Sequence, residues 1–177
     1  ELFPADYWRF FLMATRPETK DTNFSWDFFL EKINADLNDT FGNFIHRTLS
    51  FINARFNSEI PQPQKLAVED EAVLLDVKGK VREIIEEIEA AKLQSAANTL
   101  MSMGRVGNQY LNEKEPWNLI KTDRERAATI LYVAAQIVKA TAIAAAPFMP
   151  TIAEQLWQTL NLHGSIHKST WENALKP

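Results

Sequence analysis

Apolar positions recur every three or four residues over long stretches of this chain, which is the spacing of one face of an α-helix. The longest such stretch runs from Trp26 to Phe56. Gly42 lies inside it and costs about 1 kcal/mol relative to Ala, so we expect a local bend or a close neighbouring backbone there. The apolar stripe of this helix should face a core, and it consists of Phe29, Ile33, Leu37, Phe41, Ile45, Thr48 and Ile52.

Similar patterns predict several further helices, with segments of loop composition between them. A short helix over 4–14 precedes a loop over 15–25, in which Ser25 is placed to cap the long helix. Residues 57–68 contain two prolines and form a connector. Because no alternating strand pattern competes, the fold class is all-α. A further helix is expected from about 69 to 88, and the pattern over 93–111 either continues that helix or forms the next one after a small kink. Another helix should run from its N-cap Asp123 to about 148, and a last one should cover 151–160 before an irregular tail.

Residues 112–117 interrupt the helical pattern and are expected to form a turn, because Pro116 disfavours the α-helical conformation of Glu115. Trp117 closes this turn, and no helical period dictates its burial. Two interpretations stay open. The indole fills a gap between helices, or it stacks on an unpaired nucleobase, an interaction worth about 1–3 kcal/mol.

The face of the long helix opposite its apolar stripe is polar and nearly uncharged. Three of its residues, Ser50, Asn53 and Asn57, offer hydrogen-bond donors and acceptors that suit the edges of unpaired bases. Helix capping, core hydrogen bonds or simple solvation would explain the same residues. The face comprises Asn43, Arg47, Ser50, Ala54 and Asn57, with His46 and Asn53 at its edge.

The residue inventory argues against a catalytic or metal site within this chain. Its 177 residues fit one domain, or one domain with a short adjoining segment, and include no Cys. The three His residues are scattered, and the carboxylates follow helix-surface spacing. With no glycine-rich phosphate loop and no His paired by spacing with a nucleophile, we expect no catalytic residue and no metal.

Charge and hydropathy narrow the possible partners. A net charge of −4 and a pI near 5.4 argue against sequence-blind adhesion to nucleic acid, although a local RNA site that relies on stacking and base-edge contacts remains open. No signal peptide pattern is evident. The apolar stretch over 127–149 is rich in Ala and is interrupted by Gln136 and Lys139, so we expect no membrane span and a soluble, cytoplasmic protein.

Several short motifs, in this order and at these spacings, resemble methionyl-tRNA synthetase, particularly its archaeal and eukaryotic branch. The resemblance covers almost the whole chain. It implies a class I aminoacyl-tRNA synthetase anticodon-binding helix bundle over 26–177, preceded by a connecting segment over 1–25 that follows the catalytic domain. The motifs are Pro4-Ala5-Asp6-Tyr7-Trp8-Arg9-Phe10-Phe11-Leu12, Arg16-Pro17-Glu18-Thr19-Lys20-Asp21, Gly42-Asn43-Phe44-Ile45-His46-Arg47, Asn108-Gln109-Tyr110-Leu111, Glu115-Pro116-Trp117 and Ala146-Pro147-Phe148-Met149-Pro150.

The resemblance implies that the bundle reads the CAU anticodon of tRNA(Met), with Trp117 stacking near its first base. In the bacterial form of the family, an Asn and an Arg one turn apart, two turns after the Gly-Asn motif, recognise bases. The aligned positions here are Ser50 and Ala54, so the prediction moves to the nearby Asn53 and Arg55. The predicted anticodon-binding residues are Trp117, Asn53, Arg55, Ser50 and Asn108, whereas Asn43 and Arg47 are expected to bond the helix to its neighbours.

By the same resemblance, the catalytic domain of the parent chain lies upstream and binds ATP and methionine. This chain alone should not aminoacylate tRNA and should hold no cofactor; its partners would be the tRNA(Met) anticodon loop and that catalytic domain. Two alternatives remain. One is the anticodon domain of another class I synthetase, such as those for leucine, isoleucine, valine or cysteine, against which the Pro-Trp turn argues. The other is a helical protein-interaction module, which the acidic composition would suit.

Overall fold

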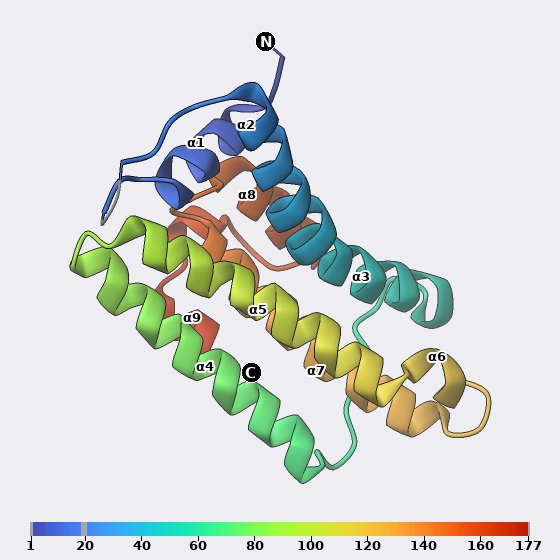
Figure 1. The fold of residues 1–177 in the computed structure, drawn as a ribbon. Coiled ribbons are helices and arrows are strands. Elements are labelled where there is room, and N and C mark those ends of the chain that lie inside the picture. Colours follow the sequence, from blue (N-terminus) through green and yellow to red (C-terminus); the bar gives the residue numbers. More distant parts are fainter. Residues whose placement is uncertain (1, 19–20, 177) are drawn as a thin grey trace.

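A computed structural model describes residues 2–18 and 21–176, and this part of the chain contains helices and no strand (Figure 1), so the all-α prediction is confirmed. The elements are α1 (Ala5–Ala14), α2 (Trp26–Lys32), the π-helix η1 (Ile33–Gly42), α3 (Asn43–Phe56), α4 (Val68–Glu89), α5 (Leu93–Lys114), α6 (Pro116–Leu119), α7 (Arg124–Ala145), α8 (Pro150–Thr159), the 3₁₀-helix η2 (Ile166–Lys168) and α9 (Trp171–Leu175).

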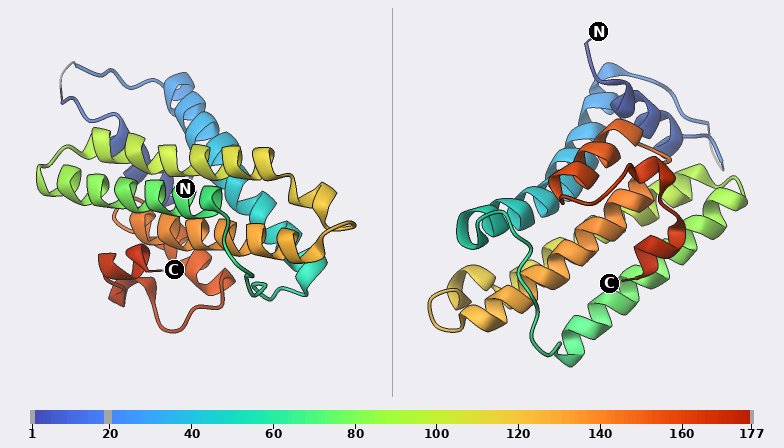
Figure 2. Two further views of the ribbon diagram at one scale, coloured as in Figure 1. Left: turned by 90° about the horizontal axis from the view of Figure 1, so that it is seen from below. Right: turned by 180° about the vertical axis from the view of Figure 1, so that it is seen from behind.

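The bundle is built around α7, which lies behind the antiparallel hairpin of α4 and α5 (Figures 1 and 2). The continuous rod of α2, η1 and α3 crosses this hairpin, while α8 and α9 cover α7 from the other side. Among the described helices, α7 alone is long and apolar enough to cross a membrane, with a mean hydropathy of 1.6 in its most apolar window. It is more apolar than its Ala content led us to expect, but 83% of that window is buried, as in the core helix of a bundle.

The long predicted helix over 26–56 is continuous, but its middle third is a π-helix instead of an α-helix. The spacing of the apolar stripe explains this. From Phe29 to Ile45 the apolar residues recur every four positions, and four such steps would rotate the stripe by about 160° around an α-helix of 3.6 residues per turn. The wider π-helical turn keeps the whole stripe on one side, and every one of its seven residues is buried.

Three glycines, Gly42, Gly104 and Gly107, lie where a side chain would meet neighbouring atoms, and the crowding at Gly42 was expected. At the end of η1, a Cβ on Gly42 would lie 2.7 Å from the carbonyl oxygen of Leu37. On α5, a Cβ on Gly104 would lie 3.3 Å from the backbone of η1, and one on Gly107 would lie 2.4 Å from the Phe44 ring. Small residues on α5 therefore let the crossing rod approach closely, and this approach sets the position of α3 relative to the end of α5.

Local signals identified most helix ends correctly. Ser25 accepts a hydrogen bond from the Phe28 amide at 3.1 Å, Asp123 accepts one from the Arg126 amide at 2.9 Å, and Pro150 opens α8. Four expectations were wrong. The chain reverses at 89–93 through a left-handed Ala91 (φ 56°), where a continuous helix or a small kink was expected. Helix α5 extends to Lys114 instead of ending at 111, and α7 ends at Ala145 instead of at about 148. The tail, expected to be irregular, contains η2 and α9.

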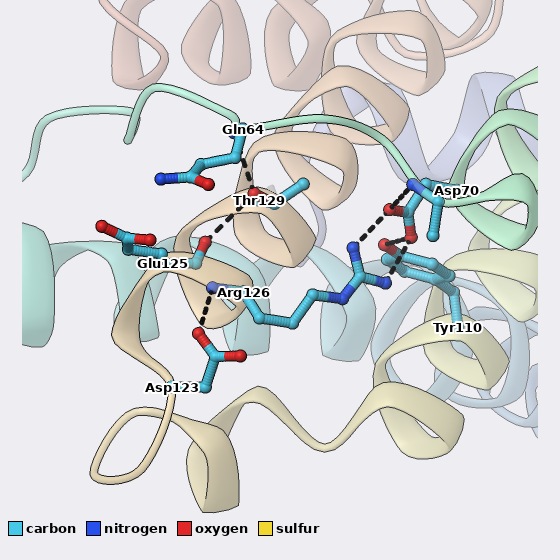
Figure 3. A network of polar contacts seen from close by, with 8 residues as sticks. Gln64, Asp70, Tyr110, Asp123, Glu125, Arg126 and Thr129 are labelled. Atoms are coloured by element: carbon cyan, nitrogen blue, oxygen red, sulfur yellow. Dashed lines mark hydrogen bonds and ion pairs between the residues drawn. The ribbon is translucent and has the colours of Figure 1, made fainter.

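A buried ionic network joins α4, α5 and α7 (Figure 3). The Asp70 carboxylate is fully buried and accepts hydrogen bonds from Arg126 Nη2 at 2.8 Å, from the Tyr110 hydroxyl at 2.7 Å and from the Ala67 amide at 2.9 Å. Burial by itself would raise the pKa of Asp70. The donors and the charge of Arg126 outweigh it and lower that pKa, and Asp70 in turn raises the pKa of Arg126.

The segment predicted to connect the bundle to a catalytic domain is fastened to the bundle by several side-chain hydrogen bonds. The buried carboxylate of Asp6 accepts a hydrogen bond from the Ile152 amide at 2.7 Å, in the first turn of α8. Farther along, Glu18 accepts from the Gln94 amide at 2.8 Å, in the first turn of α5, and Arg16 donates to the Ala91 carbonyl. Thr19 and Lys20 of the same motif lie outside the described residues, and the boundary at 25/26 stays a prediction.

Candidate nucleic-acid interface

A groove of about 450 Å³ opens where α3, α5, α6 and α7 meet, and we call it the Trp117 groove. Apolar side chains of Phe51, Leu111 and Leu131 form much of its surface, and polar groups of α3 stand along one side. This size falls within the range of about 300–1,000 Å³ that is typical of ligand pockets. The lining residues are His46, Arg47, Ser50, Phe51, Leu111, Pro116, Trp117 and Leu131.

Trp117 reaches the groove through a single left-handed residue and a short helix. Glu115 leaves the right-handed α region, as Pro116 predicted, and adopts φ 42° and ψ 56°. Pro116 then occupies the first position of α6, where its missing N–H costs nothing. Trp117 is therefore the second residue of a helix, not part of an irregular turn, and it is 37% exposed. The indole is not sealed within the bundle, which leaves part of its surface accessible to a ligand.

Arg47 holds a positive charge against this indole. Its guanidinium carbon lies 5.2 Å from the centroid of the Trp117 ring, a cation–π distance. The same guanidinium donates to the side-chain oxygens of Asn108 at 3.2 Å and Asn112 at 2.8 Å. Both acceptors belong to α5, so the Arg47 guanidinium of α3 is held between α5 and the Trp117 ring of α6.

Asn108 is half-buried and acts as a bridge behind Arg47. Its side-chain oxygen accepts from Asn43 at 3.3 Å and from Arg47, while its amide nitrogen donates to the Thr40 carbonyl at 2.9 Å. These contacts use both lone pairs of the oxygen and one of the two N–H groups, so little of the amide is free for a further partner. A direct contact of Asn108 with a base stays a prediction.

Asn43 and Arg47 bond α3 to α5 through Asn108, as expected. Sequence reasoning missed that Arg47 also lines the groove and touches Trp117. The signal was present in the Gly-Asn-Phe-Ile-His-Arg motif, where an Asn and an Arg stand one turn apart. The Asn-Arg pair that the resemblance describes lies two turns later, so Arg47 was expected only to bond the helix to its neighbours, whereas in the structure it does this and also lines the groove.

The other predicted residues divide between neighbouring sites. Ser50 is exposed and lines both the Trp117 groove and a second hollow of about 280 Å³, which Asn53 also lines. The side-chain oxygen of Asn53 accepts from the Ser58 hydroxyl at 2.6 Å. Arg55 is exposed in the last turn of α3, where its carbonyl accepts from Arg124. The structure therefore brings Ser50 to Trp117 and sets Asn53 and Arg55 farther along α3.

No group of three or more His, Asp or Glu residues within 2–18 and 21–176 is arranged to hold a metal ion. The groove itself holds one permanent cation, a hydroxyl, an imidazole and an aromatic face. Such a set can bind a planar, partly polar ligand.

The helical bundle has the fold of part of the class I methionyl-tRNA synthetases. The free-state Mycobacterium tuberculosis methionyl-tRNA synthetase superposes with a TM-score of 0.88 at 26% identity, covering 97% of this chain and 36% of that one. The same enzyme in complex with methionyl-adenylate superposes with a TM-score of 0.81 at 28% identity, over 85% of this chain and 30% of that chain.

Sequence comparison gives the family directly. The model of the anticodon binding domain of methionyl tRNA ligase matches residues 60–177, and that of the class I tRNA synthetases (M) matches residues 1–49. The chain belongs to the family of anticodon-binding domains of methionyl tRNA ligases.

Its full-length relatives include archaeal methionine–tRNA ligases, which supports the archaeal side of the expected branch. The Pyrobaculum aerophilum enzyme is 42% identical over 177 residues, covering 100% of this chain, and the Aeropyrum pernix enzyme is 39% identical over 175 residues, covering 99% of it. This chain spans 30% of the length of each of these relatives.

Proposed function

We propose that this chain reads the CAU anticodon of tRNA(Met) as part of an ATP-dependent methionine–tRNA ligase. One observation carries the proposal most strongly. A partly exposed indole stands at the wall of an apolar groove, beside a fixed cation and uncharged polar groups. Unpaired bases in RNA are recognised by such a combination of an aromatic stacking surface and edge-directed hydrogen bonds.

Each side of the groove would make a different contribution to binding. The Trp117 indole would stack on the first anticodon base, and the apolar surface around Leu111 and Leu131 would exclude water from that contact. Ser50 and His46 offer hydrogen-bonding groups at the polar side. Arg47 places a positive charge beside the stacked base, where it can donate to a base oxygen or to a phosphate.

The net charge of −4 fits a specific contact better than a broad electrostatic one. A protein that binds mainly through phosphates loses affinity steeply with salt. Here the groove contributes one Arg and mostly uncharged atoms. We therefore expect a shallow salt dependence, with affinity set by stacking and base contacts.

In the whole enzyme, methionine and ATP would bind the catalytic domain, which forms methionyl-adenylate and transfers methionine to the tRNA end. This chain would select and position the tRNA without supplying a catalytic residue or holding a cofactor. We expect the parent enzyme to act in the cytoplasm. The proposed anticodon-binding residues are Trp117, Ser50, Asn53, Arg55 and Asn108, to which the groove geometry adds Arg47.

Competition among anticodon stem-loops tests the proposal. A fluorescent stem-loop with the CAU anticodon is bound to the chain and displaced by unlabelled loops that differ only in one anticodon base. Stronger displacement by CAU than by every variant supports the proposal. Preference for another anticodon would point to a different specificity, and absence of binding would favour a protein-interaction module.

A further inference from the structure

A small pocket of about 140 Å³ lies against one face of α7 and shares no lining residue with the Trp117 groove. Four of its residues belong to α7 and stand three or four positions apart, which places them on the same side of that helix. The remaining walls come from the connector before α4 and from the segment that follows α8. We call it the Lys139 pocket, lined by Ile60, Tyr132, Ala135, Gln136, Lys139, Leu160 and Leu162.

The size and the walls of the Lys139 pocket limit what it can hold. Ile60, Leu160 and Leu162 give it an aliphatic surface. Its volume is below the range of about 300–1,000 Å³ that is typical of pockets for whole ligands. The pocket therefore suits a short apolar group better than a complete small molecule.

Lys139 is the one cationic residue of this lining, and it is half-buried. Its Nζ donates a hydrogen bond to the Lys176 carbonyl at 3.1 Å, where the tail reaches α7 beyond α9 (Figure 2). In the part of the chain that the structure describes, no carboxylate forms an ion pair with Lys139. Glu172 of α9 pairs with Lys176 instead, and both of these side chains are exposed to water.

The surroundings of Lys139 disfavour its charged form. Taking an ammonium group out of water without a counter-charge has a cost, and burial accordingly lowers the pKa of Lys139. An ordinary lysine, with a pKa of about 10.4, is almost entirely protonated at pH 7 and is a poor nucleophile. Partial desolvation in an apolar pocket is one of the ways in which proteins activate a lysine amine.

We propose that Lys139 is an acylation site, which takes a short acyl group from an acyl phosphate or an acyl thioester. The lone pair of the neutral Nζ attacks the carbonyl carbon of the donor and forms a C–N bond. The bond from that carbon to the phosphate oxygen or to the sulfur breaks, and the leaving group keeps the electron pair as phosphate or thiolate. The proton that Nζ loses passes to water.

The product of this reaction fits the pocket better than the ammonium group does. Acylation removes the unpaired charge of Lys139. The amide keeps one N–H, which can still donate to the Lys176 carbonyl. The short acyl chain can lie against the aliphatic walls of the pocket, so the bundle keeps its fold when Lys139 is modified.

The initial rates at which individual lysines are acylated test this inference. The chain is incubated at pH 7 with acetyl phosphate in one arm and with acetyl-coenzyme A in the other, and the occupancy of each lysine is measured by mass spectrometry at early times. Lys121 and Lys168, which are exposed, serve as the reference. We expect Lys139 to react several-fold faster than either of them with at least one donor, and the donor that shows this preference identifies the source of the acyl group.

Unfolding the chain in urea separates the pocket from the local sequence. The preference for Lys139 over Lys121 and Lys168 should disappear in the unfolded chain, because the pocket no longer exists there. A rate at Lys139 that is equal to or below those of the exposed lysines with both donors would overturn the proposal. A preference that persists in urea would overturn it as well.

A matched pair of substitutions tests the apolar surroundings of Lys139. Leu162→Glu places a carboxylate in the wall of the pocket, where it can pair with the ammonium group and keep Nζ protonated. Leu162→Gln introduces a side chain of the same length without the charge. Acylation of Lys139 should be several-fold slower in Leu162→Glu than in Leu162→Gln, and equal rates in two folded variants would contradict the role of the pocket. Should Leu162→Glu fail to fold, the comparison of native and urea-unfolded chains still decides.

Discussion

Removal of Arg126 should reveal how strongly the buried network holds the bundle together. Asp70 has no exposed surface, and Arg126→Ala would leave its charge without a cationic partner. Breaking a buried pair in this way typically costs about 3–5 kcal/mol. We expect the lower end, about 3 kcal/mol, because the Arg126 side chain is 25% exposed and because Tyr110 and the Ala67 amide still donate to Asp70.

The pH dependence of this loss follows from the pKa of Asp70. In the native chain the pKa of Asp70 is lower than in the unfolded chain, where it is about 3.9. The stabilisation that Asp70 contributes is therefore fully present above about pH 3.9 and is lost as the pH falls through the lower pKa of the folded state. In Arg126→Ala the effect of burial is no longer outweighed, and the pKa of Asp70 should rise. The folded variant then takes up a proton as the pH falls, so its deficit relative to the native chain should shrink from pH 7 toward pH 5.

Urea unfolding followed by far-ultraviolet circular dichroism at the two pH values measures this difference. Arg82→Ala, which removes an exposed Arg on α4, serves as the matched control and should change stability by at most about 0.5 kcal/mol. A loss below about 1 kcal/mol for Arg126→Ala at pH 7 would contradict the estimate taken from buried pairs. An equal loss at both pH values would contradict the account of Asp70.

Two further substitutions test the packing that positions the groove and the N-terminal segment. Gly107→Ala would place a Cβ 2.4 Å from the Phe44 ring and should lower the free energy of unfolding, measured by thermal unfolding, by about 1–3 kcal/mol. Gly79→Ala, which has open space around it, should raise that free energy by up to about 1 kcal/mol. Equal effects of the two substitutions would refute the close helix approach. Asp6→Ala removes the carboxylate that accepts from the Ile152 amide and should cost about 0.5–2 kcal/mol in urea unfolding. A loss no larger than that of Asp21→Ala, in an exposed loop, would show that this cap contributes little.

The sequence was most informative where the determinants are local. The apolar stripe of the long helix is buried at all seven predicted positions, because apolar residues that recur every three or four positions favour one side of a helical rod. Ser25 and Asp123 cap the helices that follow them, because a cap needs only its own side chain and the next turn. The π-helix was missed, although the exact four-residue spacing from Phe29 to Ile45 contained the signal.

Features that depend on contacts between distant segments were not accessible in the same way. The reversal at Ala91 rests on a left-handed Ala, a residue that gives no turn signal in the sequence. The position of Arg47 against Trp117 depends on acceptors supplied by Asn108 and Asn112 of another helix. Helical counting placed Arg47 on the polar face but could not show which neighbour that face meets.

The central claim is that the Trp117 indole stacks on a base of the anticodon. The most direct test is the affinity of the CAU stem-loop for Trp117→Ala, with Trp26→Ala as the control, since Trp26 is 50% exposed and lies in α2, at the opposite end of the bundle from α6 (Figure 1). Trp117→Ala should weaken binding by about 1–3 kcal/mol with its helical content intact, and Trp26→Ala should leave it unchanged. Unchanged affinity of Trp117→Ala, or an equal loss in both variants, would contradict the account.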